Sequence, residues 1–209
     1  MPKVYVCLVI VIFSFFLVQV VKRFIIFWCM ITCWSCLFYL GPHGNDETRC
    51  FVLTNLSSHH VTDATCVVCC SKLPVFDKYP LIDGTFFLSP QRYNTDLQVL
   101  NDHRMLYLNA VCMKCLQGQR GQLCCVACKT PWYGSAFVIG SMYAYDIFAA
   151  IPCCAQRLGC KNCSKSIIDP SCSFPFFSQY SKPIRCPHCQ VEDHHFIKPL
   201  EQLYTLRRM

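Results

Sequence analysis

The chain has 209 residues, of which 20 are cysteine, and a formal net charge of +7. Such a cysteine content indicates either the disulfide scaffold of a secreted protein or metal sites in a reducing compartment. Residues 1–44 carry +3 of the charge and the remainder carries +4. Two four-cysteine zinc sites would add about −4, which brings the folded domain near neutral, so bulk charge gives no support to nucleic-acid binding.

Two apolar runs open the chain. Residues 4–21 and 24–40 are separated by Lys22 and Arg23, and each run is long enough for one membrane crossing at about 1.5 Å per residue. No small-residue cleavage site ends the first run. Three interpretations stay open: a membrane anchor with one or two transmembrane segments, a signal peptide, and an aberrant gene start upstream of a soluble domain.

The composition changes at Gly41–Asn45, where glycine, proline and polar residues follow the apolar runs. We therefore expect two parts, an apolar leader over residues 1–44 and a cysteine-rich zinc-binding domain over residues 45–209. Zinc-bound thiolates indicate a reducing compartment. This predicts a cytoplasmic domain, or a membrane-anchored domain that faces the cytosol if the leader is genuine.

The segment before the cysteine pairs predicts extended structure. Asp83 and Gly84 give a turn signal, Thr85–Leu88 has strand composition, and Met105–Val111 indicates a second strand. Residues 91–103 are polar and predict a surface loop.

Cysteine pairs with two residues between them recur along the rest of the chain. A pair at this spacing lies on a tight turn, where both thiolates reach one tetrahedral metal ion at about 2.3 Å. The order of the pairs predicts two consecutive four-cysteine zinc sites, formed by Cys112, Cys115, Cys125 and Cys128 and by Cys160, Cys163, Cys186 and Cys189. A cross-braced arrangement, in which the first and third pairs share an ion, stays open.

A third zinc site is a hypothesis that joins two distant pairs, Cys66 with Cys69 and Cys153 with Cys154. The alternative is that these thiols are small buried apolar groups. His194 and His195 are further candidate ligands.

Residues 141–151 predict a helix that Ser141 caps and Pro152 ends. Apart from Asp146 the segment after Ser141 is almost entirely apolar, so this helix should be buried. A hairpin core is predicted from the apolar residues between Cys163 and Cys186, namely Phe174, Phe176, Phe177, Tyr180 and Ile184. The expected fold class is a small α+β zinc-built domain, with zinc-ribbon or treble-clef-like β-hairpins around one buried helix, preceded by an apolar and candidate transmembrane leader.

No catalytic site is indicated. The chain has no P-loop, no GxGxxG motif after a strand and no HExxH motif. Chance pairings abound among 20 cysteines and 7 histidines, so no nucleophile and base can be assigned.

Several long strings resemble the cysteine-rich middle domain of the Headcase family. They are spread over residues 70–200 and comprise Lys78–Pro90, Ala110–Leu116, Met142–Ala150, Pro152–Cys154, Phe176–Ser181, Cys186–Cys189 and His195–Leu200. The resemblance implies a non-enzymatic regulator of growth and development that is cytoplasmic and also nuclear. It further implies protein partners such as Unkempt, a CCCH zinc-finger RNA-binding protein. The expected function is therefore a zinc-binding adaptor with a rigid surface for a protein partner.

Two other functions stay open. Single-stranded RNA is commonly held by aromatic and basic side chains, and such a patch could be formed by Arg120, Lys129, Trp132 and Tyr133. A RING-like ubiquitin ligase would need the cross-braced arrangement, but the chain lacks the short Cys-x-His-x2-Cys centre of a RING.

Overall fold

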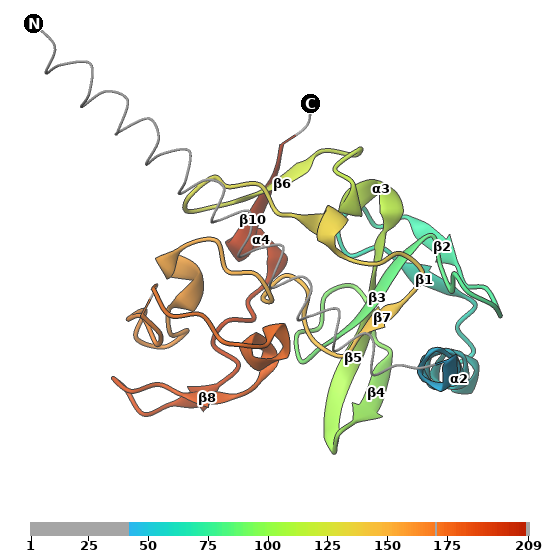
Figure 1. Ribbon diagram of the computed structural model, residues 1–209, viewed down its shortest axis with the longest axis horizontal. Coiled ribbons are helices and arrows are strands. Elements are labelled where there is room, and N and C mark those ends of the chain that lie inside the picture. The colour runs from blue at the N-terminus through green and yellow to red at the C-terminus, as the bar shows by residue number, and fades with distance from the viewer. Residues whose placement is uncertain (1–41, 170, 208–209) are drawn as a thin grey trace, which may run out of the picture. The chain divides into compact units, whose positions relative to one another are not determined.

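The computed structural model describes residues 42–169 and 171–207 (Figure 1). The chain divides into two compact units, Met1–Asp46 and Glu47–Met209, and the architecture below is that of the second unit. Most of the expected leader lies outside the described residues. Of the helices that are described, none combines the length and apolar character that a membrane crossing requires.

A four-stranded sheet with the order β4-β5-β3-β7 forms the centre of the unit. Its strands are β3 (Gly84–Ser89), β4 (Gln98–Asn101), β5 (Arg104–Cys112) and β7 (Met142–Tyr143). β3 pairs antiparallel with β5 over its whole length and parallel with β7, and β4 pairs antiparallel with the first half of β5. Every residue of β3 is buried, so both faces of the central strand are covered.

The two predicted strands are confirmed. Thr85–Leu88 lies within β3 and Met105–Val111 lies within β5. The polar segment 91–103 is only partly a loop, because β4 forms in it and makes a tight hairpin with β5. Asp102 and His103 occupy the turn with φ angles of 47° and 59°, the left-handed conformation that a two-residue type I′ turn requires.

The predicted helix over residues 141–151 is wrong. This segment contains β7 and then turns. The physical reason is Asp146, whose buried carboxylate accepts hydrogen bonds from the N–H groups of Phe148 (2.8 Å) and Ala149 (3.1 Å) and so stabilises a turn. The segment is nonetheless buried, as its composition predicts, since Ile147 and Phe148 are 0% exposed.

Asp146 also joins this segment to distant parts of the chain. Its second carboxylate oxygen accepts hydrogen bonds from the hydroxyls of Ser89 (2.6 Å) and Tyr93 (2.8 Å). The backbone N–H of Asp146 donates to the Ser181 hydroxyl oxygen (2.8 Å). Burial raises the pKa of the Asp146 carboxyl, although these hydrogen bonds act in the opposite direction. Burial also raises the pKa of Tyr93 well above its usual value, so its hydroxyl remains a hydrogen-bond donor.

The remaining elements are short. Those between the leader and the sheet are α2 (Pro42–Ser58), β1 (Asp63–Thr65) and β2 (Lys72–Pro74), and those between β5 and β7 are α3 (Met113–Leu116), β6 (Gln122–Cys125) and the 3-10 helix η1 (Gly134–Ala136). The C-terminal elements are the 3-10 helices η2 (Ala155–Leu158) and η3 (Phe177–Ser181), then β8 (Ile184–Arg185), β9 (Glu192–Asp193), α4 (Leu200–Leu203) and β10 (Tyr204–Arg207). In Figure 1 the orange segments around β8 lie to the left of the sheet, and β10 returns to pair antiparallel with β6.

Two apolar cores result. In the main core, Phe148 packs against Phe87 (ring centroids 5.5 Å apart), Trp132 (4.9 Å) and Tyr204 (6.0 Å). A smaller core surrounds Tyr180 and Phe196, whose ring centroids are 5.7 Å apart. Phe174 packs on the smaller core as predicted, whereas Phe176 is 54% exposed and does not belong to it.

We predict that Asp146→Ala lowers the free energy of unfolding by about 3 kcal/mol, because it leaves two N–H groups and two hydroxyls in the core without their acceptor. Urea denaturation measures the change. Asp96→Ala is the control, since Asp96 is 80% exposed in its pair with Arg92 and its loss should cost less than about 0.5 kcal/mol. Equal effects of the two substitutions would contradict the role given to Asp146.

Candidate metal centres

Three groups of four cysteines come together in the described part of the chain, and within each group the Sγ atoms lie within 4.8 Å of one another. The first cluster is Cys66, Cys69, Cys112 and Cys115. The second cluster is Cys125, Cys128, Cys153 and Cys154. The third cluster is Cys160, Cys163, Cys186 and Cys189.

Four of the cysteine pairs share one turn geometry. In each turn the N–H of the first cysteine donates to the carbonyl oxygen five residues later at 2.9 Å, and the residue after the second cysteine donates its N–H back to the first cysteine's carbonyl. That residue has a φ angle between 58° and 62° in all four turns, at Cys70, Lys129, Ser164 and Gln190. A non-glycine residue costs of order 1 kcal/mol in this conformation. Its recurrence indicates a shared constraint, which is that both thiols of a pair face one point.

The first cluster joins one such turn to the end of the central sheet. Cys112 is the last residue of β5 and Cys115 lies in α3. The Cys112 N–H donates to Cys66 Sγ at 3.4 Å, and the Sγ atoms of Cys69 and Cys112 are 3.7 Å apart. Cys66, Cys112 and Cys115 are buried and form part of the main core.

The second cluster joins the end of β6 to the irregular segment before η2. Cys125 Sγ lies 4.0 Å from Cys154 Sγ, and Cys128 Sγ lies 3.4 Å from Cys153 Sγ. Cys125 is buried, whereas Cys128 and Cys153 are exposed. No cysteine of the first or third cluster is exposed, so this cluster has the greatest access to solvent.

The third cluster joins the turn after η2 to the turn of the β8–β9 hairpin. The Sγ atoms of Cys160 and Cys189 are 3.6 Å apart, and those of Cys163 and Cys186 are 3.7 Å apart.

Both candidate histidine ligands lie outside the four-sulfur group, and His195 lies directly beside the third cluster. His195 is 1% exposed, with Nδ1 at 3.6 Å from Cys160 Sγ and Nε2 donating to the Val191 carbonyl at 3.1 Å. This places the ring against a cluster sulfur, where it fills the space behind the site. His194 instead lies at 3.0 Å from the Ser181 carbonyl through Nδ1.

The grouping differs from the predicted one in two of the three sites. Cys112 and Cys115 do not meet Cys125 and Cys128, and the hypothetical set of Cys66, Cys69, Cys153 and Cys154 does not form either. The reason is a β-bridge that lays Cys66 alongside Ala110, where the Val67 N–H donates to the Ala110 carbonyl at 2.8 Å and brings the first pair to the end of β5. The four cysteines predicted for residues 160–189 do come together.

The sulfur spacing fits one metal ion per cluster. Four sulfurs at about 2.3 Å from a tetrahedral ion are about 3.8 Å apart, and the close Sγ pairs here are separated by 3.4 to 4.0 Å. Four cysteines with this spacing suit a soft or borderline tetrahedral cation such as zinc.

The thiols of the first cluster also change one another's acidity. The pKa of Cys112 is lowered because it accepts hydrogen bonds from Cys115 and Cys66, and the pKa of Cys115 is raised because it donates to Cys112. The pKa of Cys66 is raised to about 11, chiefly by its hydrogen bond with Cys112. One thiol therefore ionises at the expense of its neighbours, and a divalent ion would allow all four to lose their protons.

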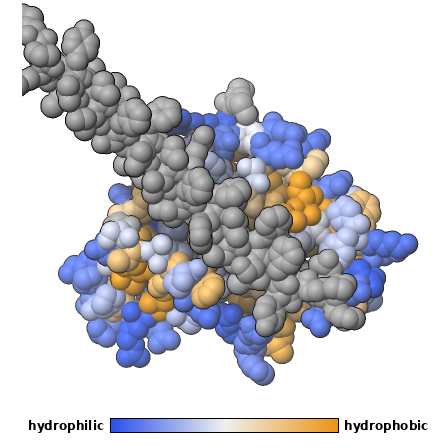
Figure 2. All heavy atoms as spheres, viewed as in Figure 1, coloured by the Kyte–Doolittle hydropathy of each residue, from blue (hydrophilic) through white to orange (hydrophobic). Residues whose placement is uncertain are grey.

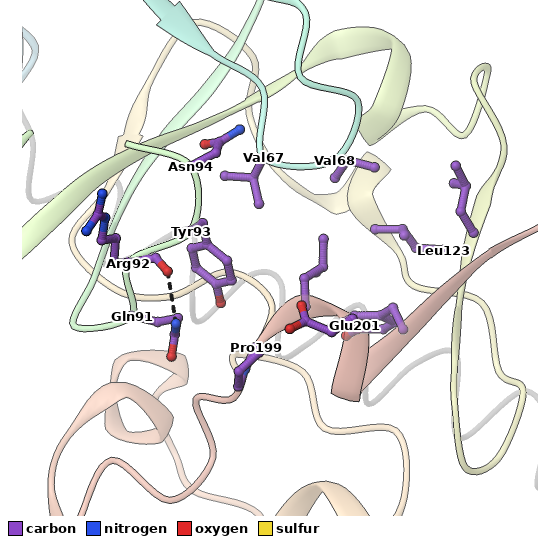
Figure 3. Close-up of a pocket in the computed structure, with 12 residues that line it drawn as sticks. Val67, Val68, Gln91, Arg92, Tyr93, Asn94, Leu123, Pro199 and Glu201 are labelled. Carbon is purple, nitrogen blue, oxygen red and sulfur yellow. Dashed lines mark hydrogen bonds between the residues drawn. The ribbon is translucent and has the colours of Figure 1, made fainter. Parts of the chain in front are cut away.

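A groove of about 400 Å³ is lined in part by Val67 and Val68, the two residues between Cys66 and Cys69 of the first cluster (Figure 3). Figure 3 shows Val67 and Val68 on one side, Tyr93 and Leu123 at its walls, and Pro199 opposite. Its charged lining residues are Arg92 and Glu201.

We predict that, in metal-loaded protein, Cys69→Ser makes Cys112 and Cys115 react at least about tenfold faster with an alkylating reagent, because an incomplete site no longer shields its thiols. Cys125 and Cys128 should stay protected, and mass spectrometry reports each cysteine separately. Cys70→Ser is the matched control, since this neighbouring cysteine is exposed and outside the clusters. If Cys125 became reactive together with Cys112, the result would contradict the clusters described here and favour a shared site of Cys112, Cys115, Cys125 and Cys128.

Comparison with known proteins agrees with the resemblance found in the sequence. A family model described as Headcase protein matches residues 39–200. The Headcase protein of Drosophila melanogaster is 48% identical over 168 residues, which cover 79% of this chain and 16% of that protein. The Headcase protein homolog of Homo sapiens is 43% identical over 164 residues, which cover 77% of this chain and 30% of that protein. No solved structure matches. With the family model covering most of its length, the chain belongs to the Headcase family.

Proposed function

We propose that the chain is a zinc-built, non-enzymatic adaptor module that holds one zinc ion in each cluster and presents a rigid surface to a protein partner. The observation that carries this proposal is the threefold recurrence of four thiols within 4.8 Å. Zinc bound to four cysteines contributes folding free energy directly. A chain with one main core and one smaller core can therefore hold its surface rigid through metal sites.

The charge of the loaded domain favours a protein partner over RNA. Each four-cysteine zinc site adds about −2, so three sites change the +4 of residues 45–209 to about −2. Nucleic-acid binding draws on positive charge at the phosphates. The expected RNA patch is also incomplete, because Trp132 is 6% exposed and packs in the main core.

A RING-like ligase receives less support. The clusters use consecutive pairs along the chain, since residues 66–115, 125–154 and 160–189 do not interleave. A cross-brace requires interleaved pairs.

The partner we propose is a CCCH zinc-finger protein of the Unkempt type, in a role that restrains growth during development. The family resemblance carries this part of the proposal. All described cysteines are free, which supports a reducing location in the cytoplasm and nucleus. Figure 2 shows small apolar patches among hydrophilic residues on one face, a composition compatible with a protein interface.

We predict three zinc ions per chain by elemental analysis of the purified protein. Cys189→Ser should reduce the content to two and abolish cooperative unfolding of the region around the third cluster, because a structural site stabilises the fold around it. Cys172→Ser, at an exposed cysteine outside the clusters, should leave three. Metal-free wild-type protein with its thiols paired as disulfides would refute zinc binding.

We also predict saturable binding of the zinc-loaded chain to the CCCH partner by calorimetry. The binding should survive ribonuclease treatment and be lost after zinc is removed by a chelator, because the surface depends on the metal-stabilised fold. A gel shift with unstructured RNA at low salt supplies the second readout, and no shift is expected. Binding that disappears with ribonuclease would favour the RNA alternative.

A further inference from the structure

The three clusters have the same ligand chemistry but different surroundings. In the first cluster three cysteines belong to the main core, and in the third cluster Cys160 and Cys186 are 1% and 0% exposed and the other two are half-buried. In the second cluster Cys128 and Cys153 are exposed. Oxidation of a cysteine follows its thiolate character and its exposure, so a small oxidant reaches the second cluster most readily.

The two exposed thiols of the second cluster are also close neighbours. Cys128 Sγ and Cys153 Sγ are 3.4 Å apart, which is the shortest of the described Sγ–Sγ contacts between cluster cysteines. A disulfide needs about 2.05 Å. Cys128 lies in the turn after β6 and Cys153 lies in the irregular segment before η2, where a shift of this size is local.

We propose that the second cluster is a site of reversible oxidation, at which a hydroperoxide converts Cys128 and Cys153 to a disulfide and releases the bound zinc ion. This inference rests on the zinc occupancy proposed above. It assigns different roles to chemically identical sites: the first and third clusters hold the fold, and the second cluster responds to oxidant.

The reaction balances with hydrogen peroxide as the two-electron oxidant. The Cys128 thiolate attacks one peroxide oxygen, the O–O bond breaks, and hydroxide leaves with Cys128 as a sulfenic acid. The Cys153 thiolate then attacks that sulfur, the S–S bond forms, and a second hydroxide leaves. Two thiolates are oxidised and one peroxide is reduced. The zinc ion, left with Cys125 and Cys154, loses half of its ligands and dissociates.

Burial explains why this oxidation should be reversible. Cys66, Cys112 and Cys115 belong to the main core, whereas no cysteine of the second or third cluster is a member of either described core, and of these two clusters only the second has exposed cysteines. Loss of the second ion therefore leaves the core packing in place, and reduction regenerates a site whose Cys125 is still held in β6 by pairing with β10.

The test uses the full 209-residue chain loaded with zinc. Its zinc content is measured first, and hydrogen peroxide is then added while a chromogenic chelator follows zinc release. Differential alkylation with mass spectrometry identifies the oxidised cysteines at each time. We expect one zinc equivalent to leave at least about tenfold faster than the other two, together with a Cys128–Cys153 disulfide. Dithiothreitol and zinc should restore the original content.

A pair of histidine variants isolates the site, because imidazole is a zinc ligand that cannot form a disulfide. Cys153→His should retain three ions and lose the fast release. Cys189→His is the matched change in the third cluster, and this variant should still release one zinc ion per chain rapidly, as the wild type does. Should Cys153→His fail to load, the disulfide map of the wild-type protein decides the question alone.

The failures are distinguishable. A chain without zinc before peroxide is added contradicts the proposed function. Three outcomes with a fully loaded chain would overturn this inference alone. The chain could lose its three zinc ions at one rate, or lose the first ion from another cluster. It could also retain all three ions while the exposed Cys172 is oxidised.

Discussion

Four thiols held within 4.8 Å of one another, three times over, are the constraint on which this structure depends. Each cluster fastens together segments that are far apart in the chain, such as Cys66 with Cys112 and Cys160 with Cys189. Crowded thiols compete for ionisation, and a bound cation would neutralise the thiolates. The sheet and the two apolar cores are built between these points, and the first cluster is itself part of the main core.

Local patterns in the sequence predicted correctly those elements whose conformation depends on neighbouring residues. The strand composition of Thr85–Leu88 and Met105–Val111 matches β3 and β5, and the turn at Cys186–Cys189 lies within the hairpin that the predicted third cluster needs. The helix predicted over residues 141–151 does not form, because the Asp146 carboxylate stabilises a local turn at Phe148 and Ala149 and is itself held there by remote partners. Asp146 is held by partners 57, 53 and 35 residues away in the chain, and no window of helical periodicity contains them.

The predicted grouping of the cysteine pairs was wrong in two of the three sites for a related reason. Proximity in sequence favoured joining Cys115 to Cys125, but a bridge between Cys66 and Ala110 places an earlier pair at the end of β5. One signal was present in the sequence. If the adjacent Cys153 and Cys154 are counted as a pair and Cys66/Cys69 is taken as the first, six pairs joined two by two in chain order reproduce all three clusters. This order was hard to recognise because Cys153 and Cys154 are adjacent, whereas the cysteines of the other five pairs have two residues between them.

The family match includes all three clusters. Residues 39–200 contain every cluster cysteine, while the chain spans 16% and 30% of the two Headcase relatives. The shared region is thus the part that contains the three clusters and most of the main core. Because the second cluster is the most exposed and lies outside both described cores, a change in its metal would alter the surface between β6 and η2 without unfolding the sheet. In the proposed adaptor, two sites would hold the shape of the surface and the third would adjust it.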